Sequence, residues 1–162
     1  MKFIADVMLG RLAKRLRLLG FDVLYDRTFD DNEIIRLSLE QDRVILTRDR
    51  GLSKRPLAAR HVLISSENVH DQLEQVLKTS RPILDSEAFL TRCSVCNEPL
   101  KSTAKQEVRD LVPSYVYDRT NRFLQCPCCG RVYWKGNHVR NFMLPGFADQ
   151  KRDRTLPGGS SK

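Results

Sequence analysis

Short apolar runs and amphipathic segments alternate along the first half of the chain. Four runs have the length and the apolar composition of buried strands, at residues 2–6, 21–25, 43–47 and 61–65. Three segments carry apolar residues at helical spacing, at residues 8–19, 30–39 and 68–77. Strands that alternate with helices in this way predict an α/β unit, with a mostly parallel sheet flanked by helices.

The first predicted helix, over residues 8–19, is amphipathic. Its apolar stripe consists of Met8, Leu12, Leu16 and Leu19. Its basic side chains are expected largely on the other faces, and they are Arg11, Lys14, Arg15 and Arg17. Gly20 stands where a helix stop is expected, because glycine accepts the backbone conformation that ends many helices.

The chain divides near Pro82, within residues 79–92, which show little periodicity. We predict a domain at residues 1–85, a small cysteine-bearing domain at residues 90–145 and a disordered tail at residues 148–162. The charged residues 101–122 predict a long, mobile hairpin or an insertion within the small domain. Residues 132–134 predict an aromatic strand.

Two short cysteine pairs lie in the second half of the chain. They are Cys93-Ser-Val-Cys96 and Cys126-Pro-Cys-Cys129. Two such turns supply four thiolates for a tetrahedral zinc, whereas a disulfide framework would spread its cysteines over the chain. We therefore predict a structural zinc site at these four cysteines in a small β zinc ribbon, with Cys128 as a bystander. The plain alternative is a set of unrelated reduced cysteines.

The basic charge of the chain is uneven. The net charge is +8, and residues 1–90 carry 15 Lys+Arg and 14 Asp+Glu, whereas residues 91–162 carry 13 and 6. The excess in the second part predicts an anionic partner, most often nucleic acid, although a solvated basic face is the plain alternative. No apolar run approaches the roughly 20 residues that span a bilayer. The reduced cysteines and the absence of a signal-peptide pattern predict a cytoplasmic protein without a membrane partner.

Acidic residues follow two of the predicted strands. Asp6 ends the first strand, and Asp49 follows the strand at residues 43–47. The carboxyl ends of parallel strands meet at one edge of a sheet, and the second helix, which begins near Asp30, Asp31 and Glu33, opens toward that edge. Converging carboxylates repel one another unless they share a cation. The group therefore predicts a site for Mg²⁺ or Mn²⁺, which prefer oxygen ligands and can activate water against a phosphodiester.

Each acid also has a plain structural explanation. Asp31 suits a helix N-cap, a role that is compatible with metal binding. Asp6 could simply end a strand. Asp49 is the most informative, because Thr47-Arg-Asp49 directly after a buried strand is rarely placed for packing alone. Arg48 and Arg50 flank it, and they could pair with carboxylates or hold phosphates.

Three motifs together resemble the Mut-seven C-terminal RNase family. They are FIADVMLGRLAKRLRLLG at residues 3–20, ILTRDR at residues 45–50, and the two cysteine pairs with GRVYWKGNH at residues 130–138. The resemblance spans roughly residues 1–145. It implies a PIN-like nuclease domain fused to a zinc ribbon, with acids that bind Mg²⁺ or Mn²⁺ for RNA cleavage.

The resemblance also implies which acids hold the metal. Asp6 matches the acid of the first strand, and Asp49 matches the acid of the Thr-x-Asp motif. The acid of the second helix maps to Asp30, Asp31 or Glu33. We favour Asp31. A PIN domain usually has a further acid after a later strand, and here none matches cleanly, although Glu67 and Asp71 are available.

The leading hypothesis is a metal-dependent ribonuclease, a hydrolase whose basic ribbon binds RNA. The predicted RNA-binding residues are Arg48, Arg50, Arg131, Lys135 and Arg140. Tyr133 and Trp134 could stack on bases, and burial within the ribbon is an equal alternative for both. His138 could ligate zinc, contact RNA or simply lie on the surface.

Two other functions remain open at this point. One is a non-catalytic RNA- or ribosome-binding module in which the acids are structural remnants. The other is a phosphoacceptor receiver domain, a further α/β fold with acids at the sheet edge. A receiver domain expects an acidic pair after the first strand and a lysine after the last strand, and the sequence has neither.

Overall fold

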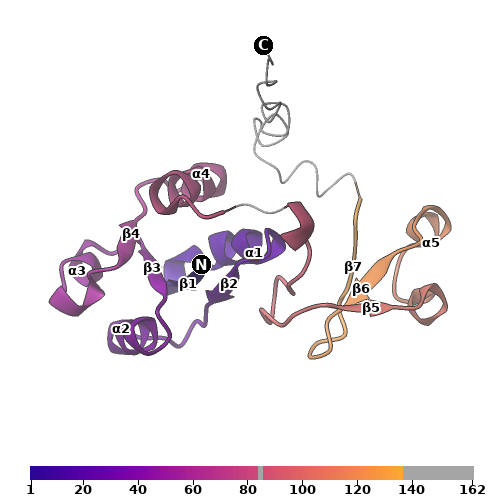
Figure 1. The fold of residues 1–162 in the computed structure, drawn as a ribbon, viewed down its shortest axis with the longest axis horizontal. Helices are drawn as coiled ribbons and strands as arrows, with labels where there is room; N and C mark the ends of the chain where they lie inside the picture. The colour runs from indigo at the N-terminus through magenta and orange to yellow at the C-terminus, as the bar shows by residue number, and fades with distance from the viewer. Residues whose placement is uncertain (84–85, 137–162) are drawn as a thin grey trace, which may run out of the picture.

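The chain folds into two units that lie side by side (Figure 1). The computed structural model describes residues 1–83 and 86–136. We call residues 2–80 the α/β unit and residues 90–136, which hold the cysteines, the ribbon unit. The predicted fold, a mostly parallel sheet flanked by helices and followed by a small β zinc ribbon, is confirmed. His138, Arg140 and the predicted tail lie outside the described residues.

The α/β unit has a four-stranded parallel sheet. Its strands are β1 (Lys2–Ala5), β2 (Asp22–Leu24), β3 (Val44–Thr47) and β4 (His61–Leu63), in the order β2-β1-β3-β4. The central strands β1 and β3 are buried on both faces of the sheet. Strands in that position are apolar at consecutive positions, which explains the continuous apolar runs that predict these two strands.

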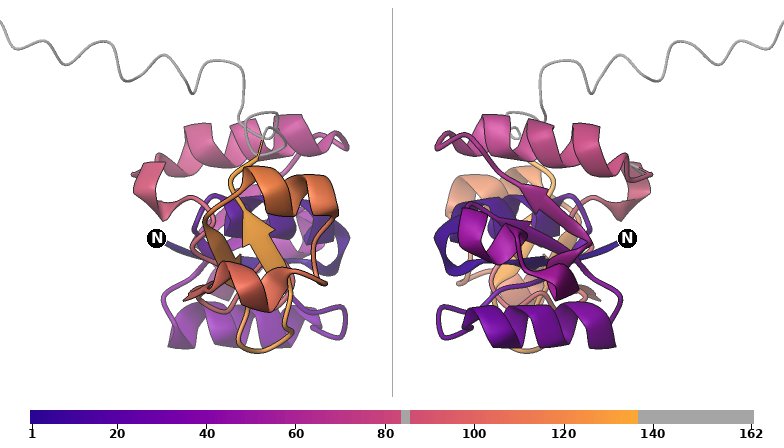
Figure 2. Two further views of the ribbon diagram at one scale, coloured as in Figure 1. Left: turned by 90° about the vertical axis from the view of Figure 1, so that its right-hand side faces the viewer. Right: turned by 90° about the vertical axis from the view of Figure 1, so that its left-hand side faces the viewer.

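Helices cover both faces of the sheet. They are η1 (Val7–Leu9), α1 (Gly10–Leu18), α2 (Asp31–Glu40), α3 (Arg50–Ser53), η2 (Pro56–Ala58) and α4 (Val69–Ser80). α1 and α4 lie on one face and α2 lies on the other (Figures 1 and 2). Within the part of the chain that the structure describes, every helix is too short or too polar to cross a bilayer.

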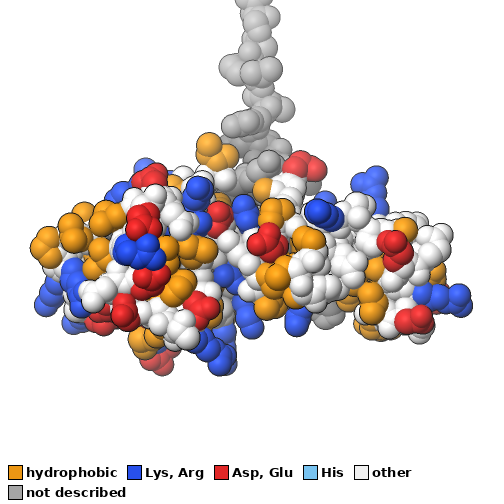
Figure 3. All heavy atoms as spheres, turned by 90° about the horizontal axis from the view of Figure 1, so that it is seen from below, with side chains coloured by type: hydrophobic (Ala, Val, Ile, Leu, Met, Phe, Trp, Pro, Cys, Tyr) orange, Lys and Arg blue, Asp and Glu red, His pale blue; other side chains and the backbone are white. Residues whose placement is uncertain are grey.

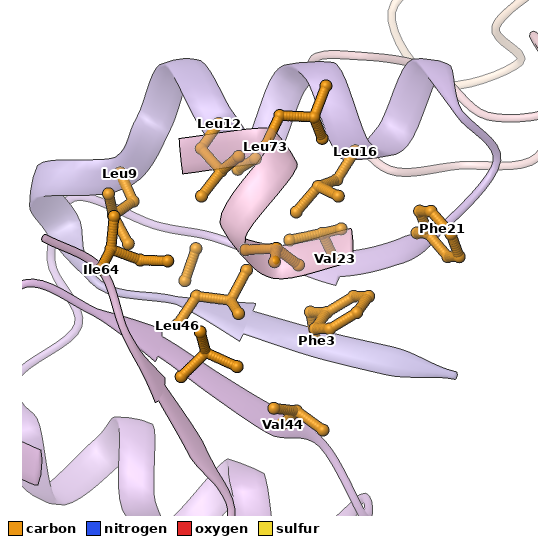
Figure 4. Close-up of a cluster of buried hydrophobic side chains, with 14 of the residues drawn as sticks. Phe3, Leu9, Leu12, Leu16, Phe21, Val23, Val44, Leu46, Ile64 and Leu73 are labelled. Atoms are coloured by element: carbon orange, nitrogen blue, oxygen red, sulfur yellow. The ribbon is translucent and has the colours of Figure 1, made fainter. Parts of the chain in front are cut away.

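Alternate residues of the central strands feed two separate cores. Phe3 packs with Leu12 of α1 and Leu73 of α4 on one face of the sheet (Figure 4). Ile4 points to the other face and packs with Ile34 of α2. The period of two in β1 therefore places successive side chains in different cores.

The first helix differs from the prediction at two side chains. Met8 does not join the apolar stripe and is 60% exposed, because it lies in the 3₁₀ turn η1 that precedes α1. Leu9 occupies the core instead. Arg17 is not on an outer face but is only 4% exposed, and its Nε and Nη2 atoms donate to the Val23 carbonyl oxygen at 2.9 and 2.7 Å.

The ribbon unit docks on the outer edge of strand β2. Nη1 of Arg17 donates to the carbonyl oxygens of Ser94 and Val95, at 3.2 and 2.7 Å, in the first cysteine turn. The backbone N–H of Val23 donates to Oδ1 of Asn97 at 3.0 Å. The ribbon unit thereby satisfies a backbone donor that an edge strand would otherwise leave open. We call these five residues the β2 seam.

Gly20 brings the connection between the two units close to helix α1. Its φ is +90°, and a Cβ atom there would lie 2.2 Å from the carbonyl oxygen of Ala88 in η3 (Ser86–Ala88). Two residues further on, the N–H of Leu90 donates to the carbonyl oxygen of Leu18 at 3.0 Å. Glycine alone suits both the positive φ and the close approach. The predicted helix stop therefore also lets the second unit dock.

A buried ion pair lies next to the β2 seam. The Asp22 carboxylate accepts from Arg43 and from the side-chain amide of Asn97, each at 2.8 Å. Burial by itself raises the pKa of Asp22, but the hydrogen bonds from Arg43 and Asn97 hold that pKa below its ordinary value. The Arg43 side chain is only 6% exposed. Removing the Asp22 charge would therefore leave a buried cation unpaired.

We expect Asp22→Asn to lower the free energy of unfolding by about 2 kcal/mol near neutral pH. A carboxyl group with a lowered pKa in the folded state stabilises the protein above its unfolded pKa of about 4, and this contribution is lost as the pH falls through the folded value. The difference from wild type should therefore shrink below about pH 4. Urea unfolding at neutral and acidic pH measures both differences.

The control for this prediction is Asp42→Asn. The Asp42 carboxylate pairs with Arg60 at an exposed site, where an ion pair contributes about 1 kcal/mol or less. Equal losses for the two variants would contradict the importance of burial at Asp22.

The ribbon unit is a three-stranded antiparallel sheet with two short helices. Its elements are β5 (Lys101–Thr103), η4 (Lys105–Val108), α5 (Ser114–Arg119), β6 (Phe123–Gln125) and β7 (Val132–Trp134). Val108, Val112 and Val116 pack against Phe123 in a core of their own. Of the two alternatives predicted for residues 101–122, a long mobile hairpin or an insertion, the structure supports an insertion between β5 and β6. Val108 ends η4, Val112 lies between the two helices and Val116 lies in α5, so no single helical stripe marks this core in the sequence.

Candidate functional site

The four predicted zinc ligands converge in the ribbon unit. The Sγ atoms of Cys93, Cys96, Cys126 and Cys129 all lie within 4.8 Å of one another. The Sγ atoms of Cys93 and Cys129 are 3.7 Å apart. Four sulfurs at about 2.3 Å from a central zinc would be separated by about 3.8 Å in a tetrahedron. The cysteines are therefore positioned to bind a metal ion, and their spacing suits a structural zinc.

Two turns of the same shape present the thiols. The Cys93 carbonyl oxygen accepts from the N–H of Asn97 at 3.0 Å, and the Cys126 carbonyl oxygen accepts from the N–H of Gly130 at 2.9 Å. Asn97 and Gly130 have positive φ values of 67° and 70°, which asparagine and glycine tolerate best. Cys128 is exposed and lies outside the four-sulfur group.

Tyr133 contacts the four-cysteine group from strand β7. Its hydroxyl lies 3.1 Å from Sγ of Cys93 and accepts from the N–H of Ser94 at 3.0 Å. Burial raises the pKa of Tyr133 to about 12, so its hydroxyl remains a donor at neutral pH. Burial also raises the pKa of Cys93, but hydrogen bonds from the Cys96 N–H and from Tyr133 lower it to about 6. Of the two explanations for Tyr133, the structure supports burial.

Asp6 lies at the carboxyl edge of the sheet and is held by three hydrogen bonds. Its Oδ2 atom accepts from the Thr47 hydroxyl at 2.7 Å, and its Oδ1 atom accepts from the N–H of Met8 at 3.3 Å. Its own N–H donates to the carbonyl oxygen of Leu46 at 2.9 Å. The side chain is buried, and these bonds turn the carboxylate from β1 toward β3.

Thr47 connects Asp6 to Asp49. Its Oγ1 atom donates to Asp6 and accepts from the N–H of Asp49 at 2.9 Å. Asp49 caps α3, because its Oδ1 atom accepts from the N–H of Gly51 at 2.6 Å. Among the described residues, Asp49 Oδ2 has no hydrogen bond and neither acid pairs with a lysine or an arginine. One threonine therefore orients the first acid and the backbone of the second.

The acids at the start of α2 have other partners. Asp30, not Asp31, is the N-cap, because its Oδ1 atom accepts from the N–H of Glu33 at 2.8 Å. Asp31 Oδ2 lies 3.3 Å from Nη2 of Arg55. Glu33 pairs with Arg36 at 2.7 Å, and this hydrogen-bonded pair lowers the pKa of Glu33.

The described acids at this edge do not gather into a group of three. Across residues 1–83 and 86–136, the four-cysteine group is the one set of three or more His, Cys, Asp or Glu side chains placed to hold a metal ion. Asp26, two residues after β2, is also at this edge but is not among the site residues predicted from the sequence. Its carboxylate accepts from the N–H and hydroxyl of Thr28. Its place after a parallel strand was the available signal. Glu67 follows β4 and pairs with Arg48 at 2.9 Å, whereas Asp71 accepts from the Ser66 hydroxyl at 2.9 Å.

The predicted RNA-binding residues lie on both units. Arg48 lines an open groove at the carboxyl edge of the sheet, and Arg50 is exposed at the start of α3. Arg131 is exposed next to the second cysteine turn, and Lys135 is exposed after β7. Arg140 lies outside the described residues. Figure 3 shows one face of the molecule, on which Lys and Arg side chains are spread over both units together with acidic ones.

A depression of about 560 Å³ lies on the ribbon unit. Its apolar lining is Phe89, Leu90, Leu100, Leu124 and Trp134. Its basic lining is Arg119, Arg122 and Lys135, and one carboxylate, Glu87, also lies there. Trp134 is half-buried, unlike Tyr133, so part of its ring remains accessible. An aromatic side chain among cations suits single-stranded nucleic acid.

A family model described as Mut7-C RNAse domain matches residues 1–144 of the chain. The match includes both the acidic edge of the sheet and the four-cysteine centre. The resemblance drawn from the sequence motifs is therefore confirmed. Comparison with the curated proteins and with the solved structures gave no match.

Proposed function

This chain belongs to the Mut7-C RNAse domain family, and we propose that it is a metal-dependent ribonuclease that cleaves RNA phosphodiester bonds. The observation that carries the proposal is the connection of Asp6 and Asp49 through the Thr47 hydroxyl, on neighbouring parallel strands. Two carboxylates at the carboxyl edge of an open sheet are well placed for a divalent cation.

We assign Asp6, Asp49 and Asp31 to the binding of Mg²⁺ or Mn²⁺. Asp6 is buried and fixed by its hydrogen bonds, whereas Asp49 is exposed and keeps one oxygen for a ligand. Asp31 would have to release Arg55 or act through a water. Mg²⁺ keeps several of its own waters in most protein sites, so two direct carboxylates and one water-mediated carboxylate would be enough to hold it.

Such a cation would activate a water and stabilise the leaving oxygen of the phosphodiester. The chain's own residues orient the parts. Thr47 holds the Asp6 carboxylate, and Gly51 holds one oxygen of Asp49. Arg48 and Arg50 flank Asp49 and would hold the phosphate that is cut.

The ribbon unit is proposed to bind the RNA backbone with Arg131, Lys135 and Arg140 around a structural zinc. Its support is the depression beside Trp134, which Lys135 lines, and the exposure of Arg131 next to the second cysteine turn. We propose residues 1–85 as the PIN-like nuclease domain and residues 90–145 as the zinc ribbon. The reduced cysteines suit the cytoplasm.

The proposal predicts cleavage that depends on a divalent cation. The purified protein should cut a labelled single-stranded RNA when Mn²⁺ or Mg²⁺ is added, and the RNA should stay intact in a matched reaction without the added cation. No chelator is used, so that the cysteine centre keeps its metal in both reactions. Denaturing electrophoresis measures the products. Intact RNA under both conditions would contradict a ribonuclease.

A non-catalytic RNA-binding module is the second candidate. It is favoured because no three acids in the described ranges form a group that could hold a metal ion. In that case the protein should retain RNA equally well with and without Mn²⁺ and should never cut it.

A further inference from the structure

A basic surface lies on the α/β unit, beside the acidic edge. It is an open groove of about 710 Å³, lined by the start of α1, the loop after β2 and the start of α4. We call it the α1 groove. Its four cationic residues are Arg11, Lys14, Arg27 and Arg48, and its one carboxylate is Glu67.

The α1 groove has unbalanced positive charge. In the described ranges, Arg11, Lys14 and Arg27 form no ion pair with an acid. Arg48 pairs with Glu67, but the Glu67 side chain is 86% exposed, so an incoming anion can displace it into water at small cost. Four cations along one open groove match a run of phosphates better than a single anion.

The α1 groove adjoins both acids of the proposed site. Met8 lines the groove, and its N–H is one of the two donors to the Asp6 carboxylate, with the Thr47 hydroxyl as the other. Arg48 also lines the groove, and it lies in the chain between Thr47 and Asp49. A polyanion that follows the groove is therefore led to the two carboxylates.

The lining of the α1 groove suits a single strand. The Tyr25 hydroxyl donates to the carbonyl oxygen of Val7 at 3.1 Å and so holds the ring against the start of α1. Gly10 leaves room for the Tyr25 ring, because a Cβ atom at position 10 would lie 2.6 Å from the Tyr25 hydroxyl oxygen. Tyr25 and the exposed Met8 offer apolar surface among the cations. Unstacked bases can use such surface, whereas a duplex keeps its bases inside.

We propose that the α1 groove binds the backbone of single-stranded RNA and leads it to the acidic edge. This inference rests on the proposed function, since it makes the groove the substrate path of the same site. It adds Arg11, Lys14 and Arg27 to the RNA-binding residues. The even charge of residues 1–90 concealed this surface, because the acids of that half lie largely elsewhere in the fold.

The test compares the full chain with Arg11→Gln/Lys14→Gln. Binding of a fluorescent oligouridylate is measured by anisotropy over a range of salt, without added Mg²⁺ or Mn²⁺, so that the RNA is not cut. Loss of two phosphate contacts should reduce the slope of log affinity against log salt by about 1.4, and affinity at about 0.1 M salt by roughly 25-fold. Arg27→Gln should give about half of the change in slope.

The matched control is Lys2→Gln/Lys78→Gln, which removes the same charge from exposed positions outside the groove. It should keep nearly all of the affinity. Equal losses in the control and the groove variant would overturn the proposal, as would an unchanged slope in Arg11→Gln/Lys14→Gln. Uridine monophosphate that displaces the oligouridylate at equal concentration would indicate a nucleotide site instead, and tighter binding of an RNA duplex would exclude the single-strand assignment.

The outcomes also separate this inference from the proposed function. If the groove variant loses affinity for RNA and the wild type never cuts RNA with Mn²⁺, the groove proposal stands and the ribonuclease proposal fails. If the wild type cuts RNA and the groove variants bind RNA as tightly as the wild type, the ribonuclease proposal stands and the groove proposal fails.

Discussion

Loss of the metal from the cysteine centre is expected to unfold the ribbon unit and to weaken the α/β unit at the same time. Structural zinc sites contribute on the order of 10 kcal/mol of binding free energy in small domains. The core around the centre is small, and its buried members are Leu90, Cys93, Cys126 and Tyr133. Cys93→Ser/Cys96→Ser should therefore abolish the ordered ribbon, and the single tryptophan, Trp134, reports this by its fluorescence.

The α/β unit should lose about 3 kcal/mol of stability in the same variant. Arg17 would lose the carbonyl oxygens of Ser94 and Val95 while its guanidinium stays against β2. Val23 would lose Asn97, the partner of its N–H. A hydrogen bond to a charged group contributes about 1.5–3 kcal/mol. Loss of the two bonds from Arg17, partly compensated by new bonds to water, therefore accounts for an expected loss of about 3 kcal/mol.

Two further variants separate the metal from the seam. Cys128→Ser is the matched control, because Cys128 is exposed and lies outside the four-cysteine group. This variant should keep the zinc, the ordered ribbon unit and the stability of the α/β unit. Arg17→Met should keep the zinc and lower only the stability of the α/β unit. Urea unfolding followed by far-ultraviolet circular dichroism, which reports mainly the helices of that unit, measures this loss. Elemental analysis measures the metal. An unchanged helical transition in Cys93→Ser/Cys96→Ser would mean that the β2 seam does not couple the units.

Features that depend on neighbouring residues were predictable from the sequence. The apolar runs of β1 and β3 and the helical spacing in α1 and α4 mark their elements directly. The rule that parallel strands end at one edge predicts that Asp6 and Asp49 lie at the same edge of the sheet. The cysteine spacing did the same for the metal centre.

Features that depend on distant residues were not predictable. Arg17 looks like a solvent-facing helix residue until Ser94 and Val95, more than 70 positions later, supply its acceptors. The prediction of Asp31 as the N-cap is wrong, because Asp30 is the residue that precedes the first turn of α2. Two adjacent aspartates are equally good N-caps in the sequence, so the sequence alone does not distinguish them. Arg55, which pairs with Asp31, follows a helix of four residues that has no periodicity to detect.

Asp6→Asn and Asp49→Asn are each expected to lower the rate of RNA cleavage at least about a hundredfold, which corresponds to about 2.7 kcal/mol in the activation barrier. Each substitution keeps the shape of the side chain and removes the charge that would hold the cation. The Thr47 hydroxyl can still donate to the amide oxygen of an asparagine at position 6. The free energy of unfolding without added Mn²⁺ should therefore change by less than about 1 kcal/mol.

The double variant Asp6→Asn/Asp49→Asn should be little slower than either single variant, because groups that hold one cation act as a unit. Thr47→Val tests the connection between the two acids. It keeps the side-chain volume but removes the hydroxyl that donates to Asp6 and accepts from Asp49. Cleavage by this variant should require more Mn²⁺ and should recover in part at saturating Mn²⁺, since both carboxylates remain.

Cation binding gives a measurement that does not depend on cleavage. Mn²⁺ should raise the melting temperature of the wild type, because a ligand that binds only the folded state stabilises it by mass action, and neither asparagine variant should respond. Asp42→Asn is the matched control, since Asp42 is exposed and pairs with Arg60 away from Asp6 and Asp49. It should keep both the cleavage and the response to Mn²⁺. Wild-type cleavage by Asp6→Asn and Asp49→Asn would remove the acids from the chemistry. Full loss of cleavage with an unchanged response to Mn²⁺ would instead show that the cation binds elsewhere and that the two carboxylates act on the RNA directly.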